Sequence, residues 1–405
     1  MKKFLFISNN TLTNTGLSGG DRILSELIKY VSQKYQCALL GSGECISQLN
    51  RYKALDNVVC YESSKLKKTI LKYNFINYFI HTINRSFFGI ISIVKYWREI
   101  KTYKYIYSAS DFYPDTIPAF IIKVFYPKII WISGFYLFAP KPFQKNNPYK
   151  TSVSRYIIGL NYWFTQLFTF LIVKKFSDFV CVTSKPDVKY FLTKHRKENK
   201  IVVVRGGVDL NKPHSYLKNN SPSLENKKFR AVFLGRLHYQ KGLLKLIDIW
   251  KIVCDKDPKS KLAIIGDGQL LREIQNKIKK YHLSKNITLL GFLDGEEKYN
   301  IFKQSAIVVH PATYDSGGMA TAEAMAWGLP GISFDLESLK TYYPQGVIKT
   351  KCFDLKEFAD NIIKLTTDKK IYSRYSKEAI KLINTHWSWD SRCQDIINQI
   401  VNNSP

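Results

Sequence analysis

The segment 310–330 combines a pair of glycines with two acidic residues at the start of a predicted helix. A run of strong helix formers occupies 319–326, and a glycine and a proline end it. The helix therefore begins near Gly318, where backbone N–H groups lack intrahelical partners and no Cβ keeps a ligand away. Such a helix start is typical of an anion-binding site.

Two carboxylates flank this helix start at different distances. Asp315 precedes the glycine pair, and Glu323 lies about 7 Å along the helix axis from Gly318, at roughly 1.5 Å per residue. Glu323 is too far away to cap the helix, but its carboxylate can accept hydrogen bonds from hydroxyl groups of a molecule lying across the first turns. An anion that carries sugar hydroxyls satisfies both features. The alternative is a buried helix after a buried strand, with both acids solvated.

Short apolar runs alternate with helical patterns along both halves of the chain, as in parallel sheets covered by helices on both faces. A chain of 405 residues is also too long for one compact core. We therefore expect an α/β fold of two Rossmann-like domains that face each other across a cleft. The expected parts are a first domain at 1–205, a polar linker at 206–228, a second domain at 229–385, and a C-terminal helix at 386–405 that packs back on the first domain.

The net charge of +29 is unevenly distributed. Residues 1–205 hold 31 Lys and Arg against 11 Asp and Glu, a net charge of +20, whereas the remaining residues carry +9. An excess in one half indicates a polyanionic partner for that half, either an anionic membrane or a nucleic acid. A general bias of the sequence toward Lys is the other explanation.

Residues 65–104 are basic and aromatic together, and apolar side chains such as Ile80, Ile83 and Phe87 recur at helical spacing. Helices of this kind lie in a membrane interface, although two ordinary helices covering the sheet are the alternative. The segment 156–173 nearly has the length of a spanning helix, but polar residues interrupt it. We expect a buried or interface-lying helix there, no transmembrane segment, and no signal peptide.

The residue types that bind metals do not occur at ligand spacing. The seven cysteines are scattered without C-x-x-C spacing, which favours a reducing compartment and argues against a disulfide framework and a zinc site. The segment 255–257 reads Asp-Lys-Asp, but it precedes a proline at a helix end, and we interpret it as a solvated turn. We expect no metal site.

Gly19 and Gly20 form a second glycine pair, at the start of a predicted helix over 21–35. This loop can approach a phosphate or sugar closely. It lacks the G-x-G-x-x-G spacing of a dinucleotide site, so a Rossmann dehydrogenase is weakly supported.

Four motifs of the second half resemble, in their order and spacing, the GT-B retaining glycosyltransferases, and most closely the large family 4, the glycosyl transferases group 1. They are GRLHYQKG at 235–242, Gly266-Asp267-Gly268, Gly291-Phe292-Leu293, and the acids Asp315 and Glu323. The resemblance is close over 200–335 and looser at Gly19-Gly20-Asp21-Arg22. Each motif is weak alone, whereas the four in order are specific.

The resemblance implies a site for a nucleotide-sugar donor. Arg236 and Lys241 would hold the diphosphate and neutralise the charge that grows on the leaving nucleotide, which removes the need for a metal. Glu323 would bind the ribose hydroxyls, and Asp315 would hold the sugar together with backbone N–H groups of the helix start. Donor-binding residues implied in this way are Gly19, Gly20, Gly235, Gly266, Gly268, Phe292, Gly317, Gly318, Met319, Ala320 and Glu323.

Three departures from the family pattern bear on how the sugar is positioned. The first acid of the pair is usually Glu and here is Asp315, and Gly317 stands where many relatives have Phe. The loop 133–136 lacks the histidine that many relatives place near the sugar. A front-face transfer, in which the donor phosphate takes the acceptor proton, needs no enzymic nucleophile, and we assign no catalytic base.

We therefore expect a metal-independent, retaining hexosyltransferase. It would move a sugar from a UDP- or GDP-linked donor, without another cofactor, to a growing cell-surface polysaccharide or lipid-linked oligosaccharide. We expect a cytoplasmic protein, peripheral on the inner face of the cell membrane, whose basic first domain contacts anionic lipid.

Two alternatives stay open. One is a nucleotide-sugar 2-epimerase or phosphorylase of the same two-domain architecture. The other is a basic nucleic-acid-binding protein, but the aromatic residues stand at core spacing and offer no stacking platform, so we expect no nucleic-acid partner.

Overall fold

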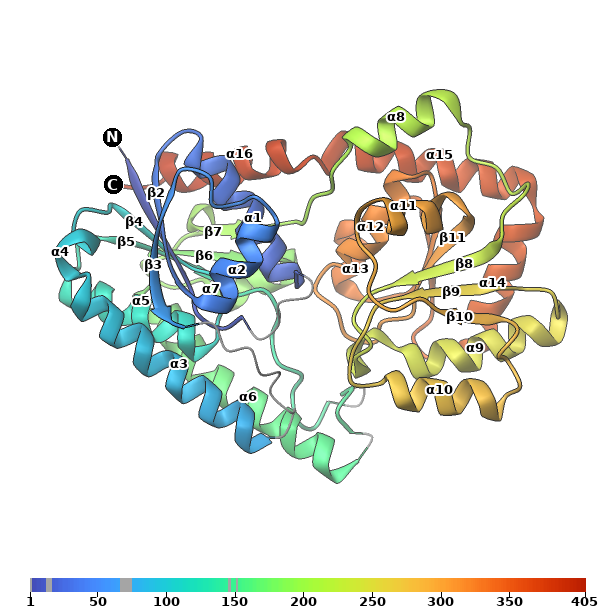
Figure 1. Ribbon diagram of the computed structural model, residues 1–405, viewed down its shortest axis with the longest axis horizontal. Coiled ribbons are helices and arrows are strands. Elements are labelled where there is room, and N and C mark those ends of the chain that lie inside the picture. The colour runs from blue at the N-terminus through green and yellow to red at the C-terminus, as the bar shows by residue number, and fades with distance from the viewer. Residues whose placement is uncertain (1, 12–16, 66–74, 145–146, 151) are drawn as a thin grey trace. The chain divides into compact units, whose positions relative to one another are not determined.

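The computed structural model describes residues 2–405 except 12–16, 66–74, 145–146 and 151. The chain forms two compact units, each built on one parallel sheet with helices around it (Figure 1). Unit 1 comprises residues 1–144, 150–205 and 392–405, and unit 2 comprises 145–149 and 206–391. The α/β class and the two Rossmann-like sheets expected from the sequence are therefore confirmed.

The sheet of unit 1 has seven parallel strands in the order β3-β2-β1-β4-β5-β6-β7. Three of its strands, β4, β5 and β6, are buried along their whole length, and β1 and β2 are buried at all but their first residue, which explains why they read as continuous apolar runs. The strands are β1 (Lys3–Ser8), β2 (Gln36–Ser42), β3 (Val58–Ser64), β4 (Tyr105–Ser108), β5 (Ile130–Gly134), β6 (Phe179–Val182) and β7 (Ile201–Val203).

The helices of unit 1 include two long ones, α3 and α6, which both pack against α5. Their bounds are α1 (Gly19–Ser32), α2 (Gly43–Arg51), α3 (Phe75–Lys95), α4 (Trp97–Ile100), α5 (Tyr113–Phe125), α6 (Val153–Phe176) and α7 (Val188–Phe191). The last helix, α16 (Trp389–Asn402), belongs to unit 1 from Arg392 onward. Within unit 1 the amide of Gln399 on α16 donates to the carbonyl of Asn199 at 3.1 Å.

The sheet of unit 2 has six parallel strands in the order β10-β9-β8-β11-β12-β13. The strands are β8 (Phe229–Leu234), β9 (Leu262–Ile265), β10 (Ile287–Leu289), β11 (Ser305–His310), β12 (Gly331–Phe334) and β13 (Val347–Thr350). The strand order reverses between β8 and β11. In open parallel sheets, ligands bind outside the carboxyl ends of the strands at such a reversal.

The helices of unit 2 cover both faces of its sheet, and the two apolar cores of the unit lie on either side. Their bounds are α8 (Asn211–Asn219), α9 (Leu243–Lys256), α10 (Leu271–Lys280), α11 (Gly295–Lys303), α12 (Met319–Ala326), α13 (Glu337–Tyr342), α14 (Leu355–Thr367) and α15 (Lys369–His386). A short 3-10 turn, η3 (Tyr239–Lys241), precedes α9.

Two elements differ from the sequence-based expectation. The polar stretch predicted as a linker contains α8. The ring of Tyr216 on this helix packs against the ring of Trp327, with 5.5 Å between the ring centroids. The helix α1 begins at Gly19, two residues earlier than predicted, because Ser18 and Asp21 form a capping box there.

Candidate active site

The loops after β8 and β11 meet at the strand-order reversal of unit 2. The amide of Thr313 donates to the carbonyl of Gln240 at 3.0 Å, which joins the two loops directly. Gly242 lies between them with φ +70°, and a Cβ there would come within 1.9 Å of the Pro311 carbonyl oxygen. Only glycine allows this close approach, so the loop over 235–242 owes its position to the last glycine of its motif.

A buried ion cluster links the same two loops. Lys241 Nζ donates to Asp315 Oδ2 at 2.5 Å, and His310 Nε2 lies 2.8 Å from the same oxygen. The other carboxylate oxygen accepts from the amide of Ser316 at 2.8 Å. The structure thus brings together two residues predicted from distant motifs, 74 positions apart in the chain.

The Asp315 side chain is only 7% exposed, whereas that of Lys241 is 21% exposed. Burial alone would raise the pKa of Asp315, but Lys241 and His310 outweigh it and hold the pKa well below its ordinary value. Asp315 is therefore an anion that fixes Lys241 in place. Because an ammonium group has three donors, Lys241 keeps donors for a second anion at the exposed side.

Arg236 and His238 belong to the loop that ends at Lys241. Arg236 is exposed at the carboxyl end of β8. Burial, followed by the positive charges of Arg236 and Lys241, lowers the pKa of His238 to about 4. His238 is neutral near pH 7 and its Nδ1 accepts from the amide of Gln240 at 3.4 Å. It shapes the loop and adds no charge.

The helix α12 begins behind Gly318, as the sequence predicts. Gly318 is the N-cap in the left-handed conformation, with φ +60°, and no side chain caps this helix start. A Cβ at Gly318 would come within 3.0 Å of His310 Nε2, and one at Gly317 would lie 2.4 Å from the ring of Tyr342. The amides of Met319 and Ala320, in the first turn of α12, lie at the positive end of the helix dipole.

Glu323 lies one turn into α12 and its side chain is 36% exposed. Lys298 Nζ, on α11, donates to Glu323 Oε2 at 2.8 Å and to Asp294 Oδ1 at 3.0 Å. Burial would lower the pKa of Lys298, but the two carboxylates outweigh it and raise the pKa above its ordinary value. The ion pair between Lys298 and Glu323 holds the Glu323 carboxylate in one orientation at the surface of unit 2.

The glycines after β8, β9 and β10 bring three neighbouring loops together. A Cβ at Gly266 would come within 1.9 Å of the Gly235 carbonyl oxygen, and one at Gly268 within 2.7 Å of the Leu237 carbonyl oxygen. The amide of Gly266 donates to the Gly291 carbonyl at 2.7 Å. Phe292, just beyond, is 48% exposed and presents a ring in a loop beside these glycines.

Gly19 and Gly20, predicted as part of the donor site, lie in unit 1 as the first residues of α1. The Ser18 hydroxyl accepts from the amide of Asp21 at 3.3 Å, and the Asp21 carboxylate accepts from the amide of Ser18 at 3.1 Å. A Cβ at Gly20 would lie 3.3 Å from the ring of Tyr136. Side chains of unit 1 therefore already cap this helix start, although Gly19 itself is exposed.

Several side chains around the site have no signature in the sequence. Lys298 reaches Glu323 only because α11 and α12 are neighbours in the fold. Tyr149 packs its ring against His238 at 6.1 Å between centroids, although it lies more than 80 positions away along the chain. His310, at the end of β11, belongs to the cluster through its contact with Asp315.

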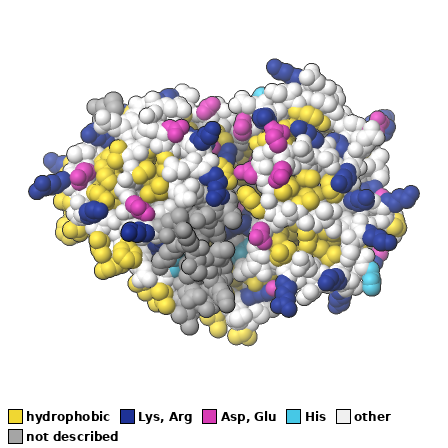
Figure 2. All heavy atoms as spheres, in the orientation of Figure 1, with side chains coloured by type: hydrophobic (Ala, Val, Ile, Leu, Met, Phe, Trp, Pro, Cys, Tyr) yellow, Lys and Arg dark blue, Asp and Glu magenta, His cyan; other side chains and the backbone are white. Residues whose placement is uncertain are grey.

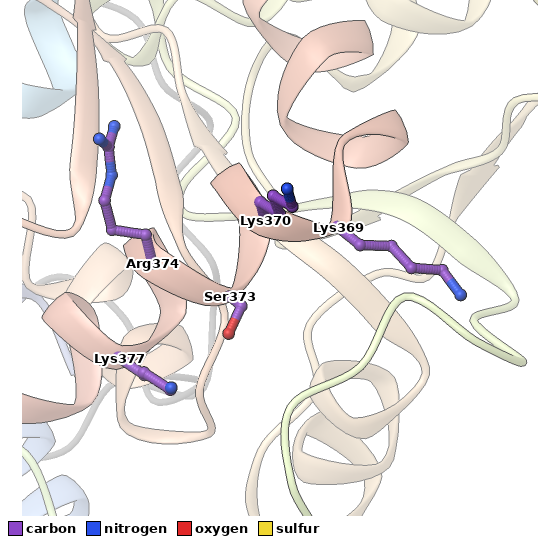
Figure 3. A pocket seen from close by; sticks show the side chains of 5 residues that line it. All are labelled: Lys369, Lys370, Ser373, Arg374 and Lys377. Atoms are coloured by element: carbon purple, nitrogen blue, oxygen red, sulfur yellow. The ribbon is translucent and has the colours of Figure 1, made fainter.

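A separate surface hollow of about 530 Å³ lies on the first turns of α15. Its lining residues are Lys369, Lys370, Ser373, Arg374 and Lys377 (Figure 3). Figure 3 shows their side chains pointing in different directions, so they do not converge on one ligand. Lys369 is also paired with Glu225 at 3.0 Å. The lining of this hollow contains no ion cluster like the one that links the loops after β8 and β11.

The acidic turn at 255–257 is engaged by cations of the protein. Asp257 pairs with Arg230, Asp255 with Lys251, and Lys256 with Asp360. Across the described part of the chain, no three His, Cys, Asp or Glu side chains gather at metal-ligand spacing.

Residues 217–382 match the family model of glycosyl transferases group 1. The chain is 24% identical over 204 residues to a poly(glycerol-phosphate) alpha-glucosyltransferase of Bacillus subtilis, an alignment covering 48% of this chain and 30% of that protein. It is 27% identical over 197 residues to a UDP-Gal:alpha-D-GlcNAc-diphosphoundecaprenol alpha-1,3-galactosyltransferase of Escherichia coli, covering 46% and 50% of the two chains. The chain thus spans half or less of these relatives.

The fold matches over the whole chain. A crystal structure of HepE from Anabaena in complex with UDP and glucose superposes with a TM-score of 0.71, covering 100% of both chains at 14% identity. The family match falls on the unit that carries the Lys241–Asp315 cluster and the uncapped start of α12. The protein therefore has the GT-B fold, and its residues 217–382 match the glycosyl transferases group 1, the family that the four motifs resemble.

Proposed function

We propose that the protein is a retaining hexosyltransferase that uses a nucleoside diphosphate sugar as donor. The observation that carries this proposal is the Lys241–Asp315 ion pair between the two loops at the strand-order reversal of unit 2. It fixes a cation on the loop that also carries the exposed Arg236, in the same unit as a helix start that no side chain caps. A diphosphate carries the charge and the acceptor oxygens that these groups bind.

In the proposed reaction, the bond between the sugar anomeric carbon and the donor phosphate oxygen breaks while the acceptor oxygen bonds to the same face of that carbon. Negative charge grows on the leaving phosphate, and Arg236, Lys241 and the amides of Met319 and Ala320 stabilise it. The acceptor proton passes to a phosphate oxygen of the leaving group. The nucleoside diphosphate leaves, and the sugar keeps its anomeric configuration.

Glu323 would accept hydrogen bonds from the ribose hydroxyls, with Lys298 holding its carboxylate. Asp315 would act mainly through Lys241, because its carboxylate oxygens already accept from Lys241, His310 and Ser316. The exposed ring of Phe292 would lie against the nucleotide base.

The acceptor we propose is a growing cell-surface polysaccharide or a lipid-linked oligosaccharide, met at the cytoplasmic face of the cell membrane. The names of the Bacillus subtilis and Escherichia coli relatives, one acting on poly(glycerol-phosphate) and one on a diphosphoundecaprenol-linked sugar, support this class. The basic surface of unit 1 supports the membrane location.

The donor site is tested by thermal unfolding of the protein with UDP, GDP and ADP and their sugar derivatives. We expect one nucleotide family to raise the melting temperature and Arg236→Ala to remove most of that shift. The matched control is Arg374→Ala, which removes another exposed arginine of unit 2, at the hollow on α15. An equal loss of nucleotide stabilisation in both variants, or none in Arg236→Ala, would contradict the assignment of Arg236.

Retention is tested on the product. With the stabilising nucleotide attached to an α-linked hexose, proton NMR of the transferred sugar should show an α anomer. A β product would contradict the proposed front-face transfer while leaving donor binding intact.

A further inference from the structure

The helix α3 turns a largely polar side toward the protein and an apolar side toward solvent. His81, Thr82, Arg85 and Ser92 are buried together with Ile93, and Arg85 pairs with the buried Glu44. The opposite side carries Ile80, Ile83, Phe87, Ile91 and Val94, which follow one another by three or four residues and are all exposed. A helix that covers a sheet in water normally has the reverse distribution.

The helix α6 repeats this inverted distribution. Its buried residues are Gly159, Gln166, Thr169 and Val173, so three of the four are polar or lack a side chain. Its exposed residues include Val153, Ile157, Ile158, Phe164, Leu167, Phe168 and Leu171, most of them on one stripe. Both helices thus place mostly polar or small residues against unit 1 and expose apolar residues.

Among the helices of the described residues, α6 is long and apolar enough to cross a membrane. Of its most apolar 18-residue segment, 22% is buried inside the protein. One side of it is nevertheless held by polar contacts within unit 1. Gln166 accepts from the amide of Ala139 at 2.6 Å and donates to Asp111 at 2.8 Å. A helix tied to a folded unit along one side presents only its other side to lipid, so it lies on a membrane surface.

The exposed stripes belong to one region of unit 1. Both α3 and α6 pack against α5, and the C-terminal end of α5 adds the exposed Val124 and Phe125. In Figure 2, hydrophobic side chains lie along the lower left of the view, where Figure 1 draws α3. Contiguous apolar surface of this kind marks a contact with a protein or a membrane.

The charge of this region favours an anionic partner. The sequence has no Asp or Glu over 63–98 or over 116–177, the two segments that contain α3 and most of α5 with all of α6. The exposed Lys95, Lys128 and Lys175 stand at or just after the C-terminal ends of α3, α5 and α6. Exposed cations beside apolar stripes match the headgroup and acyl layers of an anionic bilayer, and each supports binding to it.

We propose that the exposed sides of α3 and α6, with the C-terminal end of α5, form a docking face that inserts apolar side chains into one leaflet of an anionic membrane. This specifies the surface behind the membrane association proposed above. Lys95, Lys128 and Lys175 contact the headgroups, while side chains such as Phe87 and Phe168 enter the acyl boundary. The polar sides of both helices stay packed on unit 1, so the protein binds one surface of the bilayer.

The test is flotation of the intact protein with vesicles of phosphatidylcholine alone or mixed in equal parts with phosphatidylglycerol. We expect binding to the mixed vesicles at low salt and weaker binding to phosphatidylcholine. Part of the binding should persist at roughly 0.5 M salt, where charge contacts are screened but apolar insertion is not.

Two paired substitutions locate the face. Phe87→Glu with Ile91→Glu on α3, and Phe164→Glu with Phe168→Glu on α6, should each lower vesicle binding by about tenfold or more. The matched control is Phe353→Glu, an exposed phenylalanine in unit 2, which should bind vesicles as the wild type does. Nucleotide-induced stabilisation reports that each variant is folded, and it keeps this test separate from that of the transferase.

A second measurement reports insertion itself. In Phe168→Trp, vesicles with brominated acyl chains should quench the additional tryptophan emission relative to the wild type. The proposal is overturned if the wild type ignores anionic vesicles at low salt, or if the glutamate variants bind as well as the wild type. It is also overturned if the wild type is a dimer that these variants dissociate and that binds no vesicles, because a second copy then covers the face.

Discussion

The helices α1 and α12 both begin at a glycine pair, yet their N-terminal ends differ. At α1, Ser18 and Asp21 cap each other's backbone, and the ring of Tyr136 lies over Gly20. At α12, Gly318 takes the left-handed conformation and no side chain caps the first turn. One glycine pair therefore begins a helix that its own side chains cap, whereas the other begins a helix whose first amides no side chain caps, as an anion site requires.

The difference lies in the neighbouring residues. Ser18 stands directly before its glycine pair, and its hydroxyl accepts from the amide of Asp21 in the first turn of α1. Asp315 stands two residues before Gly317 and turns one carboxylate oxygen to Lys241 and His310. Substitutions at both helix starts and at the residues that contact them can break or sharpen the comparison.

The largest effect is expected for Lys241→Ala. It removes a cation that we place at the donor diphosphate, so sugar transfer should fall by roughly 100-fold or more. It also leaves the Asp315 carboxylate buried without its lysine, which should lower the free energy of unfolding by about 3 kcal/mol. Transfer assays and urea unfolding measure the two effects.

The double variant Lys241→Ala with Asp315→Asn separates these two effects. Removing the buried charge as well should restore much of the unfolding free energy, while transfer stays low. If transfer returns together with stability, Lys241 has a structural role only. A cation near the start of α12 would then no longer distinguish that helix start functionally from the start of α1.

The pair Gly318→Ala and Gly20→Ala tests the two helix starts directly. At Gly318 a methyl group meets a φ of +60° and lies 3.0 Å from His310 Nε2, so we expect a loss of about 1 kcal/mol in stability and clearly weaker nucleotide binding. At Gly20 the methyl group meets only the Tyr136 ring at 3.3 Å, and nucleotide binding should stay close to wild type. Calorimetric titration compares them, and equal effects on nucleotide affinity would remove the distinction.

A smaller effect is expected for Glu323→Gln. The amide accepts hydrogen bonds more weakly than a carboxylate and loses the ion pair with Lys298, so nucleotide affinity should fall by about tenfold, or roughly 1.4 kcal/mol. The matched control is Asp294→Asn, which removes the other carboxylate beside Lys298. A similar loss of affinity in the control would assign the effect to Lys298 and not to contact between Glu323 and ribose.

The smallest effect concerns α1. Ser18→Ala removes the N-cap of α1 and should cost about 1 kcal/mol of stability, with no change in nucleotide affinity. Thermal unfolding and titration of the same preparation measure both quantities. A loss of nucleotide affinity as large as that of Gly318→Ala would show that the start of α1 also serves the donor.

Much of the fold could be predicted from the sequence because buried parallel strands are continuous apolar runs. The start of α12 at Gly318 followed from helix formers after two glycines, and the loops carrying Arg236, Lys241 and Asp315 followed from motifs placed after strands. These features are local. The topology of parallel sheets then brings the loops together at the strand-order reversal.

The parts that could not be predicted depend on contacts between distant segments. The pairing of Lys298 with Glu323 requires the packing of α11 beside α12. The helix α8 lies in a polar stretch, and its Tyr216 packs against Trp327, which is more than a hundred positions later in the chain. The sequence also did not reveal that the apolar side of α6 is exposed. Composition gives its length and hydropathy, whereas Gln166 and its contacts decide which side faces the protein.

The most direct test of the account is a crystal structure with the nucleoside diphosphate that most stabilises the protein. We predict phosphate oxygens within hydrogen-bonding distance of Lys241 Nζ and of the amides of Met319 or Ala320, with the ribose at Glu323. A diphosphate bound away from the loops after β8 and β11, with Lys241 and the start of α12 unchanged, would contradict the central claim.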